Sequence, residues 1–346
     1  MKTVIITGSA GLLGSHLIGR FSSRGYKVIG IDSLIGGYSS NMPKNSSSFT
    51  HLNIDILNRK KLEEEILKIT SSVDLTVHCA ALAHEGLSVF SPKTIVENIY
   101  AGTASIASLA VSLKCPTLIN TTSMARYGEI TPPFRESDTP RPVDPYGLAK
   151  LHAEEHLNLM SDIYGFKVFH MVPHNVCGPH QCYSDPFRNV MSIFANRVKK
   201  DKPVYIYGDG EQMRSFSHVE DCIDAFITLY NKRDLISNKE VFNIGPDDGT
   251  EMTITELAHK VSAQFNKPTQ IINVPDRPRE VKKAWVSTEK AKRVLGYKTK
   301  HSPEDTIRDT VIWMRNQPDR DFNYHLDLEI ITEKTPKTWT EQLFNK

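Results

Sequence analysis

The stretch TVIITGSAGLLGSHLIGRFSSRG, residues 3–25, decides the fold of this chain. It opens with five β-branched residues, continues through glycines at 8, 11 and 14, and runs on with apolar residues at helical spacing. Strand, glycine turn and helix in this order form a variant of the dinucleotide-binding fingerprint. Glycines permit the tight turn and let a pyrophosphate approach backbone N–H groups at a helix start. The stretch therefore favours a bound dinucleotide, with a simple tight turn as the alternative.

The second strand pattern supports the dinucleotide. KVIGID, residues 27–32, ends in Asp32 at about the distance from the glycine turn, roughly 20 residues, that such folds use. A carboxylate there can accept hydrogen bonds from both ribose hydroxyls of NAD and would repel a 2′-phosphate. We therefore expect NAD as the cofactor.

Strand and helix patterns alternate along the first half of the chain. Further strands are predicted at residues 51–55, 73–81 and 117–123, and a long helix is predicted at residues 94–114. Residues 36–50 are polar and turn-rich and should form a loop. This alternation predicts an α/β fold with a Rossmann-type, doubly wound parallel sheet that binds ligands at the carboxyl ends of its strands.

The composition excludes several classes of protein. The 346 residues carry a formal net charge of +2, which gives no reason to expect a nucleic-acid or membrane partner. No apolar run is long enough for a bilayer, and the N-terminus lacks a signal-peptide pattern. Five scattered cysteines indicate reduced thiols in a cytoplasmic protein without a metal. His78 and His84 have no metal-spaced partner, so we interpret them as core or rim histidines.

A phenol and an ammonium stand four residues apart in VDPYGLAK, residues 143–150. On a helix, Tyr146 and Lys150 would share one face, and Pro145 suits a first helical position. The positive charge is expected to lower the tyrosine pKa, as a general base requires, although a solvated surface pair is the alternative. Ser123 lies at the carboxyl end of the predicted fifth strand, where such sheets place their chemistry.

Ser123, Tyr146 and Lys150 together resemble the triad of the short-chain dehydrogenase/reductase family. More narrowly, the chain resembles the extended branch, the NAD-dependent epimerases and dehydratases of nucleotide sugars, and within it the UDP-hexose 4-epimerases. The resemblance covers residue 1 to about residue 315. It rests on the glycine loop, SMARYG (123–128), YGLAK (146–150), HNVCGP (174–179), YGDGEQMRSFSHVED (207–221) and STEKAKRVLGY (287–297).

The resemblance implies roles for these residues. Tyr146 would remove a proton from a sugar hydroxyl while hydride passes to NAD. Lys150 would hold the nicotinamide ribose, and Ser123 would form a hydrogen bond with the reacting oxygen. The cofactor contacts would be Gly8, Gly11, Leu12, Leu13, Gly14, Asp32, Asp55, Ile56, Ala80, Ala81, Asn98, Tyr146, Lys150 and Pro173.

The two residues after Ser123 separate the branches of the family. The dehydratases carry an acid and a base for water elimination there, the decarboxylases a glutamate, and two GDP-sugar groups a cysteine. Met124 and Ala125 cannot transfer protons, so the resemblance implies oxidation and re-reduction of one carbon. We expect an epimerase that inverts C4 of UDP-glucose and UDP-galactose, or of the N-acetylated pair, through a 4-keto intermediate.

Two positions depart from the family pattern. Arg126 stands where members usually have a small or apolar residue, and it should either form a salt bridge within the scaffold or touch an anionic substrate. Val172 replaces an arginine that many members carry.

The second half should bind the substrate. We expect an NAD-binding domain over 1–173 with contributions from about 216–246, and mainly a smaller α/β cap over 174–315. Arg214 and Arg277 would clamp the diphosphate, and the small Ala284 would leave room for an N-acetyl group. The substrate contacts would be Ser123, Asn175, Asn189, Val190, Tyr205, Tyr207, Arg214, Arg277 and Glu280. For the two tyrosines, packing is the alternative.

Other assignments stay open. A nucleotide-sugar 4-ketoreductase, or an epimerase of a CDP-, GDP- or dTDP-sugar, is the alternative activity, and a non-catalytic nucleotide-binding protein is the alternative class. We expect a homodimer through the helices at 94–114 and 146–164, and a place in polysaccharide or glycoconjugate synthesis. The tail, residues 316–346, should be an ordered extension packed on the protein, with an interaction segment or a poorly ordered terminus as alternatives.

Overall fold

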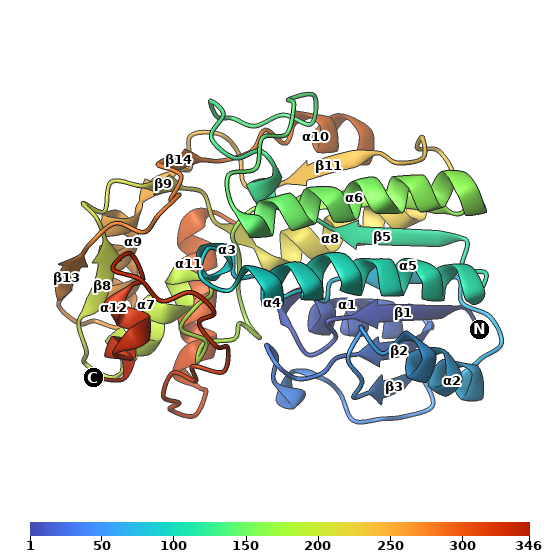
Figure 1. Cartoon of the computed structure of the whole chain (residues 1–346), viewed down its shortest axis with the longest axis horizontal. Helices are drawn as coiled ribbons and strands as arrows, with labels where there is room; N and C mark the ends of the chain where they lie inside the picture. The colour runs from blue at the N-terminus through green and yellow to red at the C-terminus, as the bar shows by residue number, and fades with distance from the viewer.

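A seven-stranded, all-parallel sheet organises the chain in the computed structural model, which describes residues 1–346 (Figure 1). Its strand order is β11-β6-β5-β4-β1-β2-β3, and the order reverses beside β1, the position at which such sheets bind ligands. The predicted Rossmann-type sheet is confirmed. The strands are β1 (Thr3–Thr7), β2 (Lys27–Ile31), β3 (Phe49–Leu52), β4 (Leu75–His78), β5 (Thr117–Thr121), β6 (Lys167–Pro173) and β11 (Val241–Ile244).

The side chains of β1 show why this sheet needs helices on both faces. Val4 and Ile6 point into one core with α1 and α8, whereas Ile5 points into the other core with α2 and α5. Successive residues of a strand face opposite sides, so an uninterrupted apolar strand must be covered twice. The covering helices are α1 (Leu12–Ser22), α2 (Arg59–Ile69), α5 (Gly102–Ser112), α6 (Pro145–Tyr164), α8 (Val219–Lys232) and α10 (Glu289–Leu295).

The helix predicted over 94–114 contains a π turn. It runs as α4 (Pro92–Val96), a π turn over Glu97–Ala101 and then α5. Asn98 lies in this turn, and its side-chain oxygen accepts a hydrogen bond of 2.8 Å from the backbone N–H of Leu82. A π turn inserts one residue into a helix and is common at functional sites.

The smaller cap is built from several segments after β6, with α8 and β11 of the sheet layer between them, and it packs around its own core (Figure 1). β8 (Val204–Tyr207) pairs with β13 (Ile271–Val274), and β9 (Met213–Arg214) lies between β12 (Met252–Thr253) and β14 (Lys283–Ala284). Its helices are α7 (Val190–Lys199), α9 (Ile254–Gln264) and α11 (Pro303–Arg315). Two short strands, β7 (Val176–Cys177) and β10 (Ser217–His218), connect the two parts.

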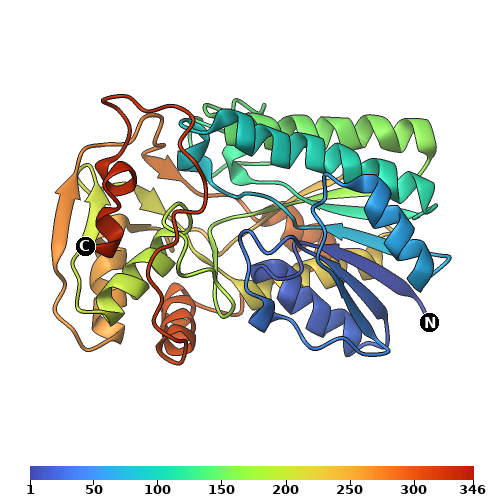
Figure 2. The same cartoon turned by 60° about the horizontal axis from the view of Figure 1, so that its bottom comes forward.

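The tail packs on the protein, as predicted. It leaves α11, crosses from the cap towards the α3–α4 region (Figure 2) and ends in α12 (Lys337–Thr340) and a short 3₁₀ helix, Leu343–Asn345. Trp339 and Phe344 are buried. The fully buried Arg197 of α7 donates hydrogen bonds to the carbonyls of Leu343 and Phe344. No helix in the structure combines the length and the apolar character needed to cross a membrane.

A buried ion pair settles the question of Arg126. Its guanidinium lies 2.8 Å from the carboxylate of Glu154 on α6, and both side chains are almost fully buried, at 6% and 5% exposed. Arg126 follows Met124 in a short 3₁₀ helix behind the end of β5. The scaffold interpretation is therefore correct.

Removal of one partner of this pair should be costly. Glu154→Ala leaves the Arg126 charge buried without compensation, and we expect the free energy of unfolding to fall by about 3–5 kcal/mol. Glu64→Ala, exposed on α2, should change it by about 0.5 kcal/mol at most. Urea denaturation of each variant measures both values. A Glu154→Ala variant as stable as Glu64→Ala would show that the pair does not hold the end of β5 in place.

Candidate functional site

A single cavity of about 400 Å³ lies at the carboxyl ends of the sheet strands and continues under the cap. It is lined by every residue that the sequence analysis assigned to cofactor or substrate. These are Gly8, Gly11, Leu12, Leu13, Gly14, Asp32, Asp55, Ile56, Ala80, Ala81, Asn98, Ser123, Tyr146, Lys150, Pro173, Asn175, Asn189, Val190, Tyr205, Tyr207, Arg214, Arg277 and Glu280. The structure thus brings together residues from positions 8 to 280, and the individual roles remain predictions.

The glycine loop has the shape of a dinucleotide cradle. A Cβ on Gly14 would lie 2.1 Å from the carbonyl oxygen of Gly8, which itself has a positive φ of +70°. Asp32 fixes the loop, because its carboxylate accepts hydrogen bonds from the N–H groups of Ala10 (2.9 Å) and Leu34 (2.7 Å). Only glycine allows such close backbone contacts at positions 8 and 14, and the loop leads into the N-terminus of α1, where a diphosphate is favoured. The residues present therefore fit NAD.

The start of α6 positions the predicted base. Asp144 caps the helix by accepting a 2.8 Å hydrogen bond from the N–H of Gly147, and Pro145 occupies the first turn as predicted. Tyr146 and Lys150 then project from one helix face, with the Lys150 ammonium 6.0 Å from the centre of the tyrosine ring. The ammonium donates to the carbonyl of Thr121 at the end of β5 (2.9 Å).

The predicted effect of Lys150 on Tyr146 is wrong for the chain alone. Burial raises the pKa of Tyr146 to about 12, and only the hydrogen bond with Ser123 and the more distant Arg188 lower it. Burial also lowers the pKa of Lys150 to about 8. Desolvation has the largest effect on the phenol, and the ammonium donates its hydrogen bond to the Thr121 carbonyl. When bound, NAD⁺ supplies the hydride acceptor and a further positive charge in this site.

Two carboxyl groups that the sequence analysis did not single out line the same cavity. Glu85 begins α3 (Glu85–Ser88) just after β4, and Asp144 caps α6. Burial raises the pKa of both groups, that of Asp144 to about 7, and the Glu85 carboxyl further disfavours ionisation of Asp144. One signal in the sequence could have indicated Glu85, because it closely follows the carboxyl end of a predicted parallel strand.

The end of the cavity that lies in the cap is aromatic. Phe344 of the tail lines it and packs against Tyr205 at 5.8 Å between ring centres. The guanidinium of Arg277 lies 4.4 Å above the ring of Tyr207 and forms two hydrogen bonds with Glu280, of 3.0 and 3.1 Å. The tyrosines therefore both pack and face the cavity. The contribution of the tail could not be foreseen, because it depends on where the chain end docks.

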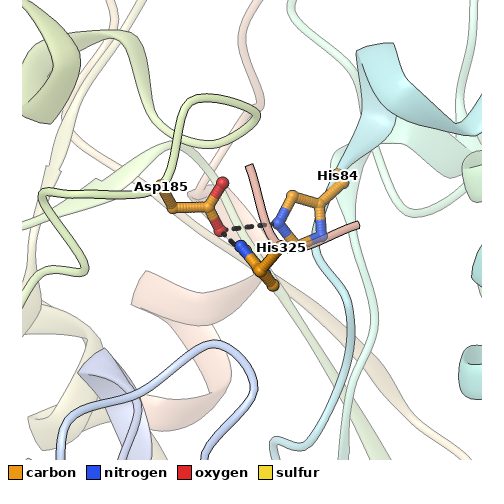
Figure 3. Close-up of side chains that lie close together, drawn as sticks. All are labelled: His84, Asp185 and His325. Carbon is orange, nitrogen blue, oxygen red and sulfur yellow. Dashed lines mark hydrogen bonds and ion pairs between the residues drawn. The ribbon is translucent and has the colours of Figure 1, made fainter. Parts of the chain in front are cut away.

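The structure also places His84 in a polar cluster with Asp185 and His325 (Figure 3). Nε2 of His84 lies 2.8 Å from Oδ2 of Asp185, and Nε2 of His325 lies 3.9 Å from the same oxygen. Burial lowers the pKa of His84, so a neutral imidazole faces the carboxylate. The cluster joins the tail to the loop that carries Glu85. His78 is a core residue, as interpreted, between the hydroxyls of Thr7 and Thr103.

Proton and hydride transfer beside a bound dinucleotide is the chemistry that this arrangement permits, which is that of a Rossmann-type enzyme acting on alcohols or sugars. The sequence model of the NAD dependent epimerase/dehydratase family matches residues 4–245. The chain therefore belongs to that family, and it is an enzyme with NAD as its cofactor.

Relatives of known activity are similar over nearly the whole chain. A UDP-glucose 4-epimerase of Mycolicibacterium smegmatis is 28% identical over 325 residues, 92% of this chain and 99% of that protein. A UDP-N-acetyl-alpha-D-glucosaminuronate decarboxylase of Bacillus cytotoxicus is 27% identical over 326 residues, 91% of this chain and 98% of that protein.

Solved structures share the fold. The UDP-glucose 4-epimerase of Thermus thermophilus, in complex with NAD, has a TM-score of 0.82 and 27% identity, covering 91% of this chain and 99% of that one. The UDP-glucuronic acid 4-epimerase of Bacillus cereus, with UDP-glucuronic acid and NAD, has a TM-score of 0.80 and 26% identity, covering 90% and 98%. Their activities differ at equal similarity, so similarity alone leaves the substrate undetermined.

The raised pKa of Asp144 predicts an unusual dependence of stability on pH. Below its ordinary pKa of 3.8, the carboxyl is neutral in the folded and in the unfolded protein. In the folded protein its pKa is about 7, so above that pH the folded protein holds the buried charge. Its contribution to stability is therefore lost as pH rises between these values. Asp144→Asn keeps the cap and removes the titration, so its stability relative to wild type should rise from pH 4.5 to 8, by at most about 4 kcal/mol.

Urea unfolding at four pH values within this range measures the effect. Glu155→Gln, on the exposed face of α6, serves as the control and should run parallel to wild type. An Asp144→Asn curve that also runs parallel to wild type would mean that Asp144 is ionised throughout, despite its burial beside Glu85.

Proposed function

We propose that this enzyme inverts C4 of the hexose in a UDP-sugar through a 4-keto intermediate. The observation that carries the proposal is the triad of Ser123, Tyr146 and Lys150 in a cavity where the next two side chains, Met124 and Ala125, hold no proton donor. Such a site exchanges one proton and one hydride with a single carbon, and return of the hydride to the other face regenerates NAD.

The other end of the cavity supports a nucleoside diphosphate sugar. Arg214 and Arg277 face it from the cap, and a guanidinium fork suits the oxygens of a diphosphate. The aromatic wall of Tyr205, Tyr207 and Phe344 suits a flat base. Ala284 lies at a side cavity beside Met124, so the small side chain leaves the N-acetylated sugar pair within the proposal.

The first experiment asks whether the enzyme cycles with its own cofactor. Protein purified without added NAD should release NAD on denaturation. Intact protein should interconvert UDP-glucose with UDP-galactose, or the two N-acetylated sugars, without external NAD. If the cofactor exchanges freely and neither pair of UDP-sugars is interconverted, the proposal of a UDP-hexose 4-epimerase is contradicted. That result would favour a 4-ketoreductase or an epimerase of a CDP-, GDP- or dTDP-sugar.

The predicted base is tested by Tyr146→Phe. This change removes one oxygen and leaves the ring packed, so NAD content and unfolding temperature should stay close to wild type. The rate of interconversion should fall by about 10²–10⁴-fold, the usual contribution of general acid–base catalysis. Equal activity of Tyr146→Phe and wild type, measured by product chromatography, would support a nucleotide-binding role instead.

We further propose a homodimer through α4–α5 and α6, which lie side by side on one face of the sheet (Figure 1). Leu148, Leu159 and Ile163 of α6 are 44%, 57% and 61% exposed, and Tyr100 beside them is 38% exposed. The three α6 positions are 11 and 4 residues apart, which places them in one stripe along the helix. These large exposed side chains, with His152 and Glu155 between them, lie on paired helices and favour burial against a second copy.

A charge in the middle of this stripe should separate the subunits. Leu159→Glu should shift the protein from dimer to monomer in light scattering coupled to size exclusion, because the interface would bury a carboxylate. Leu67→Glu replaces a leucine of equal exposure, 56%, on α2 and should remain dimeric. A monomeric wild type would contradict the proposal directly.

A further inference from the structure

The cluster of His84, Asp185 and His325 joins three segments that are far apart in the chain (Figure 3). His84 directly precedes α3, Asp185 lies in the loop before α7, and His325 belongs to the tail. Each side chain offers one atom that can bind a metal ion, and these three atoms lie within 4.8 Å of one another. The side chains of His84 and Asp185 are 0% and 1% exposed, and that of His325 is 14% exposed.

The ring of His325 turns an unpaired nitrogen towards a carboxylate. Its Nδ1 lies 2.9 Å from the carbonyl oxygen of Asn323, which can only accept, so Nδ1 carries the proton. In the neutral ring, Nε2 then presents a lone pair. This nitrogen is buried, has no hydrogen-bond partner and lies 3.9 Å from Oδ2 of Asp185. That distance is too long for a hydrogen bond, whereas a metal ion with bonds of about 2 Å spans it.

Asp185 is held so that one of its oxygens faces both imidazoles. Oδ1 accepts a hydrogen bond of 2.9 Å from the N–H of Phe187, whereas Nε2 of His84 lies 2.8 Å from Oδ2. A tetrahedral Zn²⁺ ion with bonds of about 2.0–2.1 Å keeps its ligand atoms about 3.3–3.4 Å apart. The two separations from Oδ2, 2.8 and 3.9 Å, lie on either side of that value, so small side-chain movements would complete the site.

We propose that His84, Asp185 and His325 bind a divalent transition metal ion of the zinc class, which fastens the tail to the two loops beside the cavity. Two imidazoles and one carboxylate suit Zn²⁺, whereas Mg²⁺ and Ca²⁺ prefer oxygen ligands alone. Three protein ligands leave a fourth position for water. When the ion binds, the proton that His84 shares with Oδ2 moves to Nδ1 of the same ring, which has no hydrogen-bond partner.

The surroundings of the cluster resemble the support that metal ligands receive. The carbonyl of Asn323 orients His325, and the N–H of Phe187 orients Asp185, as the groups behind metal ligands do. The ring of Phe187 also packs against both imidazoles, at 6.3 and 6.4 Å between ring centres. An aromatic neighbour on both histidines limits their rotation and the access of water.

A positive neighbour limits how strongly the cluster attracts cations. Arg188 follows the aspartate by three residues, and its charge acts on the Asp185 carboxylate. Its guanidinium donates to the carbonyl of Gly36 at 3.4 Å, and the residue lines the main cavity. General electrostatic attraction therefore contributes little, and binding depends on the three coordinate bonds. Loss of one ligand should then abolish the site.

The metal ion would act on the walls of the cavity rather than on the reaction. None of its three ligands lines the main cavity, but the residues that follow them do. Glu85 and Gly86 follow the first histidine, Pro186 and Phe187 follow the aspartate, and Phe344 of the tail lines the cap end. An ion that joins these segments would hold the walls in fixed relative positions. The inference is independent of the proposed function, because it concerns no sugar and no hydride transfer.

Metal retention tests the site in full-length protein that carries no histidine tag and has been stripped with a chelator. After addition of ZnCl₂ and gel filtration, wild type should retain about one zinc ion per chain, measured by atomic absorption. His325→Gln removes the least buried ligand and should weaken zinc binding by about 100-fold or more in competition with a chelating dye. His259→Gln replaces an exposed histidine of α9 and should bind zinc as wild type does.

A second readout follows the tail. Zinc at about 100 times its dissociation constant should raise the unfolding temperature of wild type and His259→Gln by about 3–5 °C and slow trypsin cleavage after the exposed Lys334. His325→Gln should unfold like metal-free wild type and respond to neither zinc nor MgCl₂. A wild type that retains no zinc, or a His325→Gln variant that retains it equally, would overturn the proposal and leave the cluster as a polar contact of the tail.

Discussion

The free energy of burying charge at the carboxyl edge of the sheet governs this site. The segment after β4, the start of α6 and the cap bring Glu85, Asp144, Lys150 and Arg277 into one cavity. Each group loses contact with water there, so burial shifts the pKa of the acids upwards and that of Lys150 downwards. Burial likewise raises the pKa of the Tyr146 phenol, to about 12.

The long helix α6 connects the chemistry to the stability of the scaffold. Its cap is a cavity carboxyl, its first turn carries Tyr146, and its second turn carries Lys150. Further along, Glu154 neutralises Arg126 behind β5, and the opposite face exposes Leu159 and its apolar neighbours. One rigid element thus fixes the distance from Tyr146 to the end of β5, just before Ser123. The buried ion pair limits displacement of these two segments, and such sites tolerate little displacement.

The tail completes the cavity from outside the family core. Arg197 binds its last carbonyls, the His84–Asp185–His325 cluster joins its middle to α3, and Phe344 reaches the nucleotide end. These contacts are distributed over the tail, so its docking links the cap to the loop that carries Glu85. The same sheet and triad can therefore select different sugars according to the segments that close the cavity.

The sequence determined by itself those features that depend on local order. The β-branched run, the glycines and Asp32 predicted the sheet and the cradle, and the spacing of Tyr146 and Lys150 predicted their shared helix face, because both follow from backbone geometry. Resemblance extended this to some of the cavity residues of the cap, among them Arg214 and Arg277. The tertiary structure alone decided the partner of Arg126, the approach of Glu85 to Asp144, the pKa of Tyr146 and the docking of the tail. Each depends on burial and on contacts between segments far apart in the chain, and neither quantity is encoded in residue spacing.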